Sequence, residues 1–281
     1  MATVTPIIDH LYERRSSPFL ALTRGSFEFL HTSPNGQSGI AFRQLSVAPL
    51  GYLSVPSGQL LIGDPFSMLQ HENNVWFPVP KGTHQVLLTQ AAVGEDKRLT
   101  AGQRAAYVSV VFDAEALARR QDDQRIKLLA HDDPSVSFDR LHSILPVLPD
   151  GSFSEAEARQ KLRPGIPVLS GSVALSDAQN FESLMPPNLQ HSGRGWLERF
   201  FEHGIPGSWF DAMDAEEPWP KACCNVSLPD ATNGENIVIC PTGWGDGRYS
   251  VILETEGEKA IALHLDFQVV PHDFLDNPNF G

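Results

Sequence analysis

The sequence predicts an α+β fold, mainly antiparallel β-sheet with a few short helices. The 281 residues include 22 glycines and 22 prolines, a proportion typical of many turns and short elements rather than long helices. From residue 47 to residue 112, short apolar runs recur, and Pro or Gly separates most of them. Runs of this kind predict β-strands joined by turns, and a hydrophobic fraction of 41% is enough to build a core.

The elements follow in order along the chain. Strands are expected at 50–55, 59–62, 76–79, 83–89 and 105–112. Asp113 is placed to cap a helix at 114–120, and Ser154 is placed to cap a helix at 154–162. A strand pair at 167–175 turns around Gly171, and helices are expected at 177–184 and 196–203. Three final strands, at 236–240, 248–253 and 260–270, predict a C-terminal β-meander.

No internal repeat and no low-complexity linker divides the chain. We therefore expect a single α+β domain over residues 1–281. Residues 1–46 are predicted to form an N-terminal extension packed on a core of residues 47–270.

The charge balance limits the classes of partner. With 21 basic and 34 acidic residues the net charge is −13, which argues against nucleic acid and fits either a basic protein partner or simply a soluble acidic protein. No apolar run approaches the ~18 residues of a membrane span, and nothing near the N-terminus resembles a signal peptide. The three cysteines cannot form a closed set of disulfides, so we expect free thiols and a cytoplasmic protein. The sequence leaves the oligomeric state open.

The segment 241–250 is the most informative part of the chain. Its closely spaced glycines permit backbone angles that other residues avoid, and the Asp-Gly pair is a strong hairpin signal. A tight turn between two strands is therefore predicted, with an aromatic and an acidic side chain on a rigid corner. The residues of this motif turn are Gly243, Trp244, Gly245, Asp246, Gly247 and Tyr249.

Together with the segments 57–65, 79–87 and 265–267, this turn resembles a bacterial family known as domain-of-unknown-function 4241 (DUF4241). The resemblance is spread over roughly residues 50–270. The central strand of the family usually carries an Asp-Gly pair, whereas this chain has Ser170-Gly171 there and keeps Asp177 downstream. The resemblance implies an α+β domain of bacterial origin with no established activity. Proteins of this kind resemble those found in polymorphic toxin and immunity neighbourhoods.

An acidic loop at 211–219 is the best candidate contact surface. Acidic groups around an aromatic anchor would steer a basic partner and supply a hot spot. The alternative is a solvated loop whose aromatic side chains turn inward. The partner-binding candidates are Asp211, Asp214, Glu216, Glu217 and Trp219.

A competing hypothesis joins Asp64, Asp246 and Asp266 as oxygen ligands of a metal or as an acid/base pair of a hydrolase. The simpler interpretation makes Asp64 and Asp246 turn residues and Asp266 a strand-end residue on the solvent face. The sequence has no His/Cys metal motif, nucleophile elbow or phosphate-binding loop, so we expect no catalytic residue, cofactor or metal. The leading hypothesis is a non-catalytic protein-binding protein, for example an immunity protein that neutralises a toxin. A hydrolase or metal-dependent enzyme is the alternative.

Overall fold

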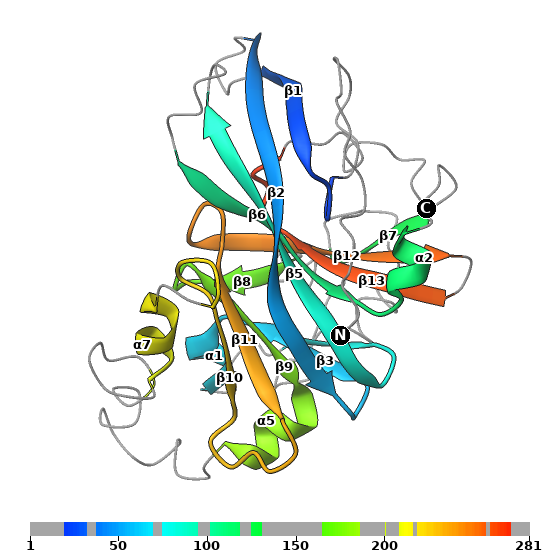
Figure 1. The fold of residues 1–281 in the computed structure, drawn as a ribbon, viewed down its shortest axis with the longest axis vertical. Coiled ribbons are helices and arrows are strands. Elements are labelled where there is room, and N and C mark those ends of the chain that lie inside the picture. The colour runs from blue at the N-terminus through cyan, green and yellow to red at the C-terminus, as the bar shows by residue number, and fades with distance from the viewer. Residues whose placement is uncertain are drawn as a thin grey trace, which may run out of the picture.

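The computed structural model describes residues 20–32, 38–69, 75–94, 102–118, 125–130, 165–185, 200, 208–215, 218–256 and 259–270. In this part of the chain, two mainly antiparallel sheets are accompanied by short helices (Figure 1). The predicted fold class, mainly antiparallel β with a few short helices, is confirmed.

The larger sheet has eight strands. Seven form a continuous path in the order β1-β2-β5-β6-β13-β12-β7, and β8 pairs with β12 beside that path. The strands are β1 (Gly25–Thr32), β2 (Ser38–Val55), β5 (Gly82–Gly94), β6 (Gln103–Val111), β7 (Arg125–Ala130), β8 (Ile166–Val168), β12 (Gly247–Glu256) and β13 (Lys259–Asp266).

The smaller sheet has five strands in the order β10-β11-β9-β3-β4. These are β3 (Gln59–Gly63), β4 (Val75–Pro78), β9 (Ser172–Asp177), β10 (Cys224–Ser227) and β11 (Asn236–Pro241). In β4, Val75 and Phe77 are buried while Trp76 and Pro78 are exposed, the two-residue alternation of a strand with one covered face. By contrast, every residue of β9 is buried, because both faces of this central strand are covered.

The main core lies where the two sheets face each other. It joins Leu53 and Val108 of the larger sheet to Ile62, Leu175 and Val238 of the smaller one, all of them essentially inaccessible to solvent. Burial of apolar side chains stabilises a fold by about 25 cal/mol per Å². The inner face of each sheet is therefore the main source of stability.

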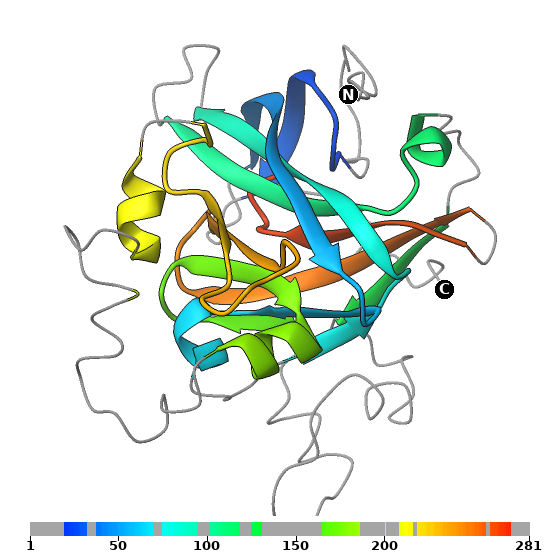
Figure 2. The same cartoon turned by 60° about the horizontal axis from the view of Figure 1, so that its bottom comes forward.

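Short helices cover the outer faces. A second apolar cluster joins the far side of the smaller sheet to α1 (Pro65–Leu69), α5 (Ala178–Leu184) and α7 (Trp209–Asp214). A third cluster joins the larger sheet to α2 (Ala114–Ala118) and to the segment around Leu22. Figure 2 shows α1, α5 and α7 beside the smaller sheet and α2 on the other side of the molecule. Among the described residues, no helix is long and apolar enough to cross a membrane.

The predicted C-terminal β-meander is wrong in one member. β12 and β13 pair as expected, but β11 lies in the other sheet, between β9 and β10. The turn after β11 does not close a hairpin, since Thr242 donates its amide to Gly171 O and Gly243 packs against the backbone of Ala105. These contacts lead the chain from one sheet into the other.

Other predicted elements are confirmed. Asp113 Oδ1 accepts the amide of Ala116 at the start of α2, and Asp177 caps α5 by accepting the amide of Asn180. Strands β8 and β9 flank Gly171, but they do not form the predicted pair: β8 pairs with β12 of the larger sheet, whereas β9 lies between β11 and β3 of the smaller one. The boundary placed between residues 46 and 47 falls inside β2, and residues 25–32 form β1 of the same sheet. The helix predicted at 154–162, and all of that predicted at 196–203 except residue 200, lie outside the described residues.

Candidate functional site

The motif turn is held by hydrogen bonds to its own backbone and to a neighbouring loop. The amide of Thr242 donates to Gly171 O at 2.9 Å, and the hydroxyl of Thr242 lies 2.5 Å from Gly245 O. The hydroxyl of Tyr249 also donates to Gly245 O, at 2.7 Å. These contacts fix the two ends of the turn relative to each other. The predicted turn is present, but it connects two sheets and does not close the predicted hairpin.

Gly243 and Gly245 must be glycine for different reasons. A Cβ on Gly243 would lie 2.1 Å from Val269 Cγ2 and 2.4 Å from Ala105 O, so no larger residue fits. Gly245 has open space around it but adopts a φ of +87°, which a side chain would strain. The sequence pattern identified both as turn residues, and the structure shows that one is required by packing and the other by its backbone angle.

Trp244 projects from this turn with half of its surface exposed to solvent, 50%. Its indole Nε1 donates to Gln268 O at 3.1 Å, and the guanidinium of Arg104 lies 4.4 Å from the ring centroid. Arg104 also donates to Gly243 O at 2.9 Å, so the same side chain holds both the backbone and the ring. A cation stacked on an indole is attracted by the ring quadrupole. The exposed ring is therefore held in one orientation.

The adjoining loop 169–171 carries a second exposed apolar side chain. Leu169 is 76% exposed, and a Cβ built on Gly171 would be 3.6 Å from Gly245 Cα. We call residues 169–171 and 242–246 the Trp244 rim. The remaining large hydrophobic residues that are exposed among the described residues, Tyr52 and Trp76, lie on β2 and β4.

Asp64 supports this rim rather than forming a catalytic or metal site of its own. Its Oδ2 accepts the amides of Leu169 and Ser170 at 2.8 and 2.7 Å, while Oδ1 accepts those of Phe66 and Ser67 at the start of α1. The side chain is 1% exposed. Four backbone donors occupy the oxygens that a metal or a substrate proton would need.

The other two candidate aspartates have different surroundings. Asp246 is exposed on the turn, whereas Asp266 is fully buried at the end of β13 and accepts the amide of Gln268 at 2.8 Å. Among the described residues, no group of three His, Cys, Asp or Glu side chains is arranged to hold a metal ion. The burial of Asp266 differs from its interpretation as a solvent-facing strand-end residue. Asp177 accepts the amide and hydroxyl of Ser57 at 2.9 and 2.6 Å.

The acidic loop is only partly within the described residues. Asp211 and Asp214 are exposed on α7, which Ser208 caps by accepting the amide of Asp211 at 3.0 Å. Trp219 packs against the main core, and its ring lies so close to Gly51 that a Cβ there would be 2.8 Å away. The ring of Trp219 is thus turned inward, as in the simpler interpretation of the loop. Glu216 and Glu217 lie outside the described residues.

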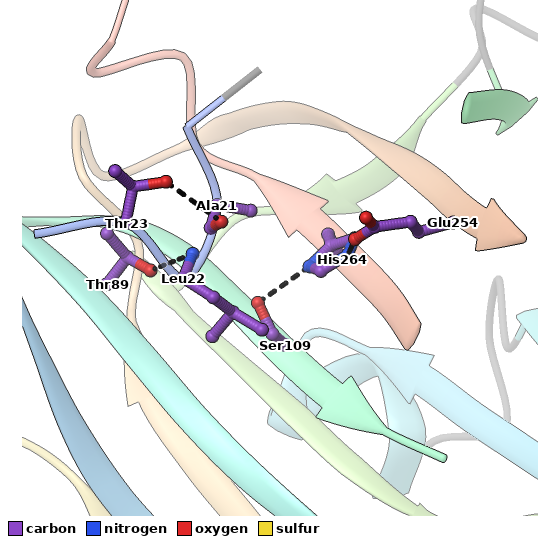
Figure 3. A network of polar contacts seen from close by, with 7 residues as sticks. All are labelled: Ala21, Leu22, Thr23, Thr89, Ser109, Glu254 and His264. Carbon is purple, nitrogen blue, oxygen red and sulfur yellow. Dashed lines mark hydrogen bonds and ion pairs between the residues drawn. The ribbon is translucent and has the colours of Figure 1, made fainter. Parts of the chain in front are cut away.

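A buried polar network on the larger sheet was not predicted. Figure 3 shows His264 between Ser109 and Glu254, with Nδ1 at 2.8 Å from the serine hydroxyl and Nε2 at 3.0 Å from the carboxylate. Close by, the amide of Leu22 donates to Thr89 Oγ1 at 2.9 Å. The strand register places His264 directly opposite Ser109. This pairing cannot be recognised from the sequence alone, so the network could not be predicted.

This serine, histidine and glutamate have the order of a hydrolase triad, but their setting is structural. All three side chains are fully buried. Ser109 lies in the middle of β6, paired with Leu87 on one side and His264 on the other, so its amide belongs to the sheet rather than to an oxyanion hole. Both ring nitrogens of His264 have a hydrogen-bond partner, the serine hydroxyl at Nδ1 and the carboxyl group at Nε2. The network links β6, β13 and β12 through satisfied polar groups.

The cysteines and His84 are also enclosed. Burial raises the pKa of both Cys223 and Cys224 to about 12, and that of Cys240 well above its ordinary value. Thiols of this kind are poor nucleophiles at neutral pH. Burial lowers the pKa of His84, whose Nε2 lies 2.7 Å from Pro80 O. The burial of the three cysteines and of His84 indicates a structural role for these side chains.

No family model, no curated protein and no solved structure matches this chain.

Proposed function

We propose that this chain is a protein-binding protein that uses the Trp244 rim as its contact surface. The observation that carries the proposal is that Leu169 and Trp244 are exposed on adjoining loops whose backbones are already fixed. Tryptophan and arginine are enriched among interface residues that dominate affinity. A partner that buries these side chains would lose little conformational entropy, because the ring is held before the partner arrives.

The partner we propose is a basic protein. The chain carries a net charge of −13, and Asp211 and Asp214 are exposed on α7. Complementary charge speeds encounter and fixes orientation more than it adds affinity. In its narrower form, the proposal takes the chain to be a cytoplasmic immunity protein that occludes the active site of a basic toxin. That form rests on the charge and on the family resemblance.

The test compares two matched double variants by cross-linking capture from a lysate of the producing organism, with quantitative mass spectrometry. Leu169→Ala/Trp244→Ala removes the apolar surface of the rim. Tyr52→Ala/Trp76→Ala removes a similar apolar surface from β2 and β4. The wild type and the second variant should retain a stoichiometric partner that the first variant loses.

Titration with the purified partner then measures the loss of binding affinity. Truncation of a hot spot costs about 2 kcal/mol or more, so Kd should rise at least ~30-fold for the rim variant. Charge reversal at Asp211 and Asp214 should slow association and weaken its dependence on salt. Equal binding by the rim variant and the wild type would exclude the rim, and a wild type that captures nothing would refute the proposal.

A further inference from the structure

Cys223 directly precedes β10, and Cys240 lies on the neighbouring strand β11 of the smaller sheet. β10 and β11 are antiparallel with Cys224 opposite Ile239, so continuing the register by one residue places Cys223 opposite Cys240. Both side chains belong to the main core, at 1% and 0% exposure, whereas Cys224 belongs to the cluster on the outer face. The two thiols therefore project from the same face of the sheet.

The spacing of facing residues suits a covalent link. Opposed residues of antiparallel strands have Cα atoms about 4.5 or 5.5 Å apart, and a disulfide requires about 4.4–6.8 Å. Burial raises the pKa of Cys240 well above its ordinary value, and the nearby thiolates of Cys223 and Cys224 would raise it further. In the structure all three cysteines are free thiols.

We propose that Cys223 and Cys240 form a cross-strand disulfide when the protein meets a small-molecule disulfide such as oxidised glutathione. One cysteine thiolate attacks the small disulfide, forming a mixed disulfide and releasing one small thiol. The second cysteine then attacks the protein sulfur of that intermediate and releases the other small thiol. The two cysteines lose two electrons and two protons in total, and one small disulfide becomes two thiols.

The position of the pair makes this reaction depend on local opening. Both thiols are buried and little ionised, so the oxidant reaches them only when the chain around Cys223 separates from β11. β10 is a four-residue strand at the edge of its sheet, and edge elements of this kind open with less free energy than the core. Closing the disulfide would then prevent that opening.

The link would fasten the segment that carries the exposed acidic residues of α7. The amide of Ala222 donates to Met213 O, and the amide of Cys223 donates to Pro220 O, so this segment is connected by hydrogen bonds to the residue that would be oxidised. The disulfide would tie the end of this segment to β11. This inference does not depend on the protein-binding proposal, since it concerns the covalent state of the free protein.

Native oxidation followed by mass spectrometry tests the inference. The folded, reduced protein is incubated with rising ratios of oxidised to reduced glutathione, and remaining thiols are then alkylated. The expected product has lost two hydrogen atoms, and a non-reducing digest contains one peptide pair joined through Cys223 and Cys240. Cys224→Ser should give the same product, while Cys223→Ser and Cys240→Ser should not.

Amide hydrogen exchange supplies a second readout that needs no variant. In the wild type, oxidation should slow exchange at residues 222–227 and leave β4, at the opposite edge of the same sheet, unchanged. A link through Cys224, a stable glutathione adduct in place of the link, or oxidation seen only in urea would each overturn the proposal. An unchanged mass of the folded wild type at every ratio would overturn it as well.

Discussion

The carboxylate of Asp64 accepts hydrogen bonds from four backbone amides, those of Phe66, Ser67, Leu169 and Ser170. It thereby joins the start of α1 to the loop that carries the exposed leucine of the rim. Replacing Asp64 with Asn keeps the volume of the side chain but exchanges one accepting oxygen for an amino group that only donates. One pair of backbone amides then loses its acceptor.

The expected loss of stability follows from the number of hydrogen bonds that the substitution removes. If Oδ2 is the oxygen replaced, the short bonds from Leu169 and Ser170 are lost, at 2.8 and 2.7 Å. A hydrogen bond to a charged group is worth about 1.5–3 kcal/mol, and a buried donor left without a partner costs about 1–3 kcal/mol. Allowing for relaxation of the loop, Asp64→Asn should lower the free energy of unfolding by about 2–4 kcal/mol. That is a large share of the ~5–15 kcal/mol typical of a domain.

Urea unfolding followed by tryptophan fluorescence measures this difference, with Asp246→Asn as the matched control. Asp246 is exposed on the turn, so its replacement should change the free energy of unfolding by less than about 0.5 kcal/mol. The slope of the free energy of unfolding against urea concentration should be the same for the wild type and both variants. An Asp64→Asn variant as stable as the wild type, or more stable, would refute the structural role and favour a functional carboxylate.

Three further predictions concern the turn, a histidine and the thiols. Gly243→Ala should destabilise the fold by about 3 kcal/mol or more, because the added methyl group overlaps neighbouring atoms. Gly234 has a positive φ but open space around it, so Gly234→Ala should cost only about 1 kcal/mol. Equal losses of stability in thermal unfolding would contradict the packing argument. Because burial lowers the pKa of His84, the unfolded chain gains a proton below pH ~6.5 before the folded protein does, so stability should fall as the pH drops through that range. His84→Gln should remove that contribution, and identical pH dependences of the free energy of unfolding would show the reasoning to be wrong. With the pKa of both Cys223 and Cys224 at about 12, the folded protein should react far more slowly with a chromogenic disulfide near pH 8 than the urea-unfolded chain does; fast reaction of the folded protein would show that these thiols are accessible.

Local patterns identified much of the secondary structure. The helix cap at Asp113 was readable because a cap uses a side chain and an amide a few residues apart, whereas Asp177, expected inside its helix, is the cap of α5. Predicted strands such as those at 59–62 and 83–89 were bounded by Pro or Gly, and they correspond to β3 and β5. The glycines of the motif turn were likewise recognisable from spacing alone.

Strand pairing was not readable in the same way. β11 and β12 are neighbours in the sequence, and a glycine-rich turn with Asp246-Gly247 favours a hairpin between them. The chain instead crosses from one sheet to the other, because Thr242 and Gly243 make contacts with residues more than 70 positions away. Such contacts depend on the whole fold, and a local pattern carries no information about them.

The sequence by itself determined the fold class, the turn residues and the acid-rich composition, because these depend on local backbone preferences and on residue counts. The tertiary structure decided which polar side chains support the fold and which face solvent. Asp64 and Asp246 look alike as turn aspartates, yet one is surrounded by four amides and the other is exposed. Likewise, only the register of β6 against β13 brings Ser109 to His264. Burial and pairing arise from contacts between distant segments, so they exist only once the sheets have assembled.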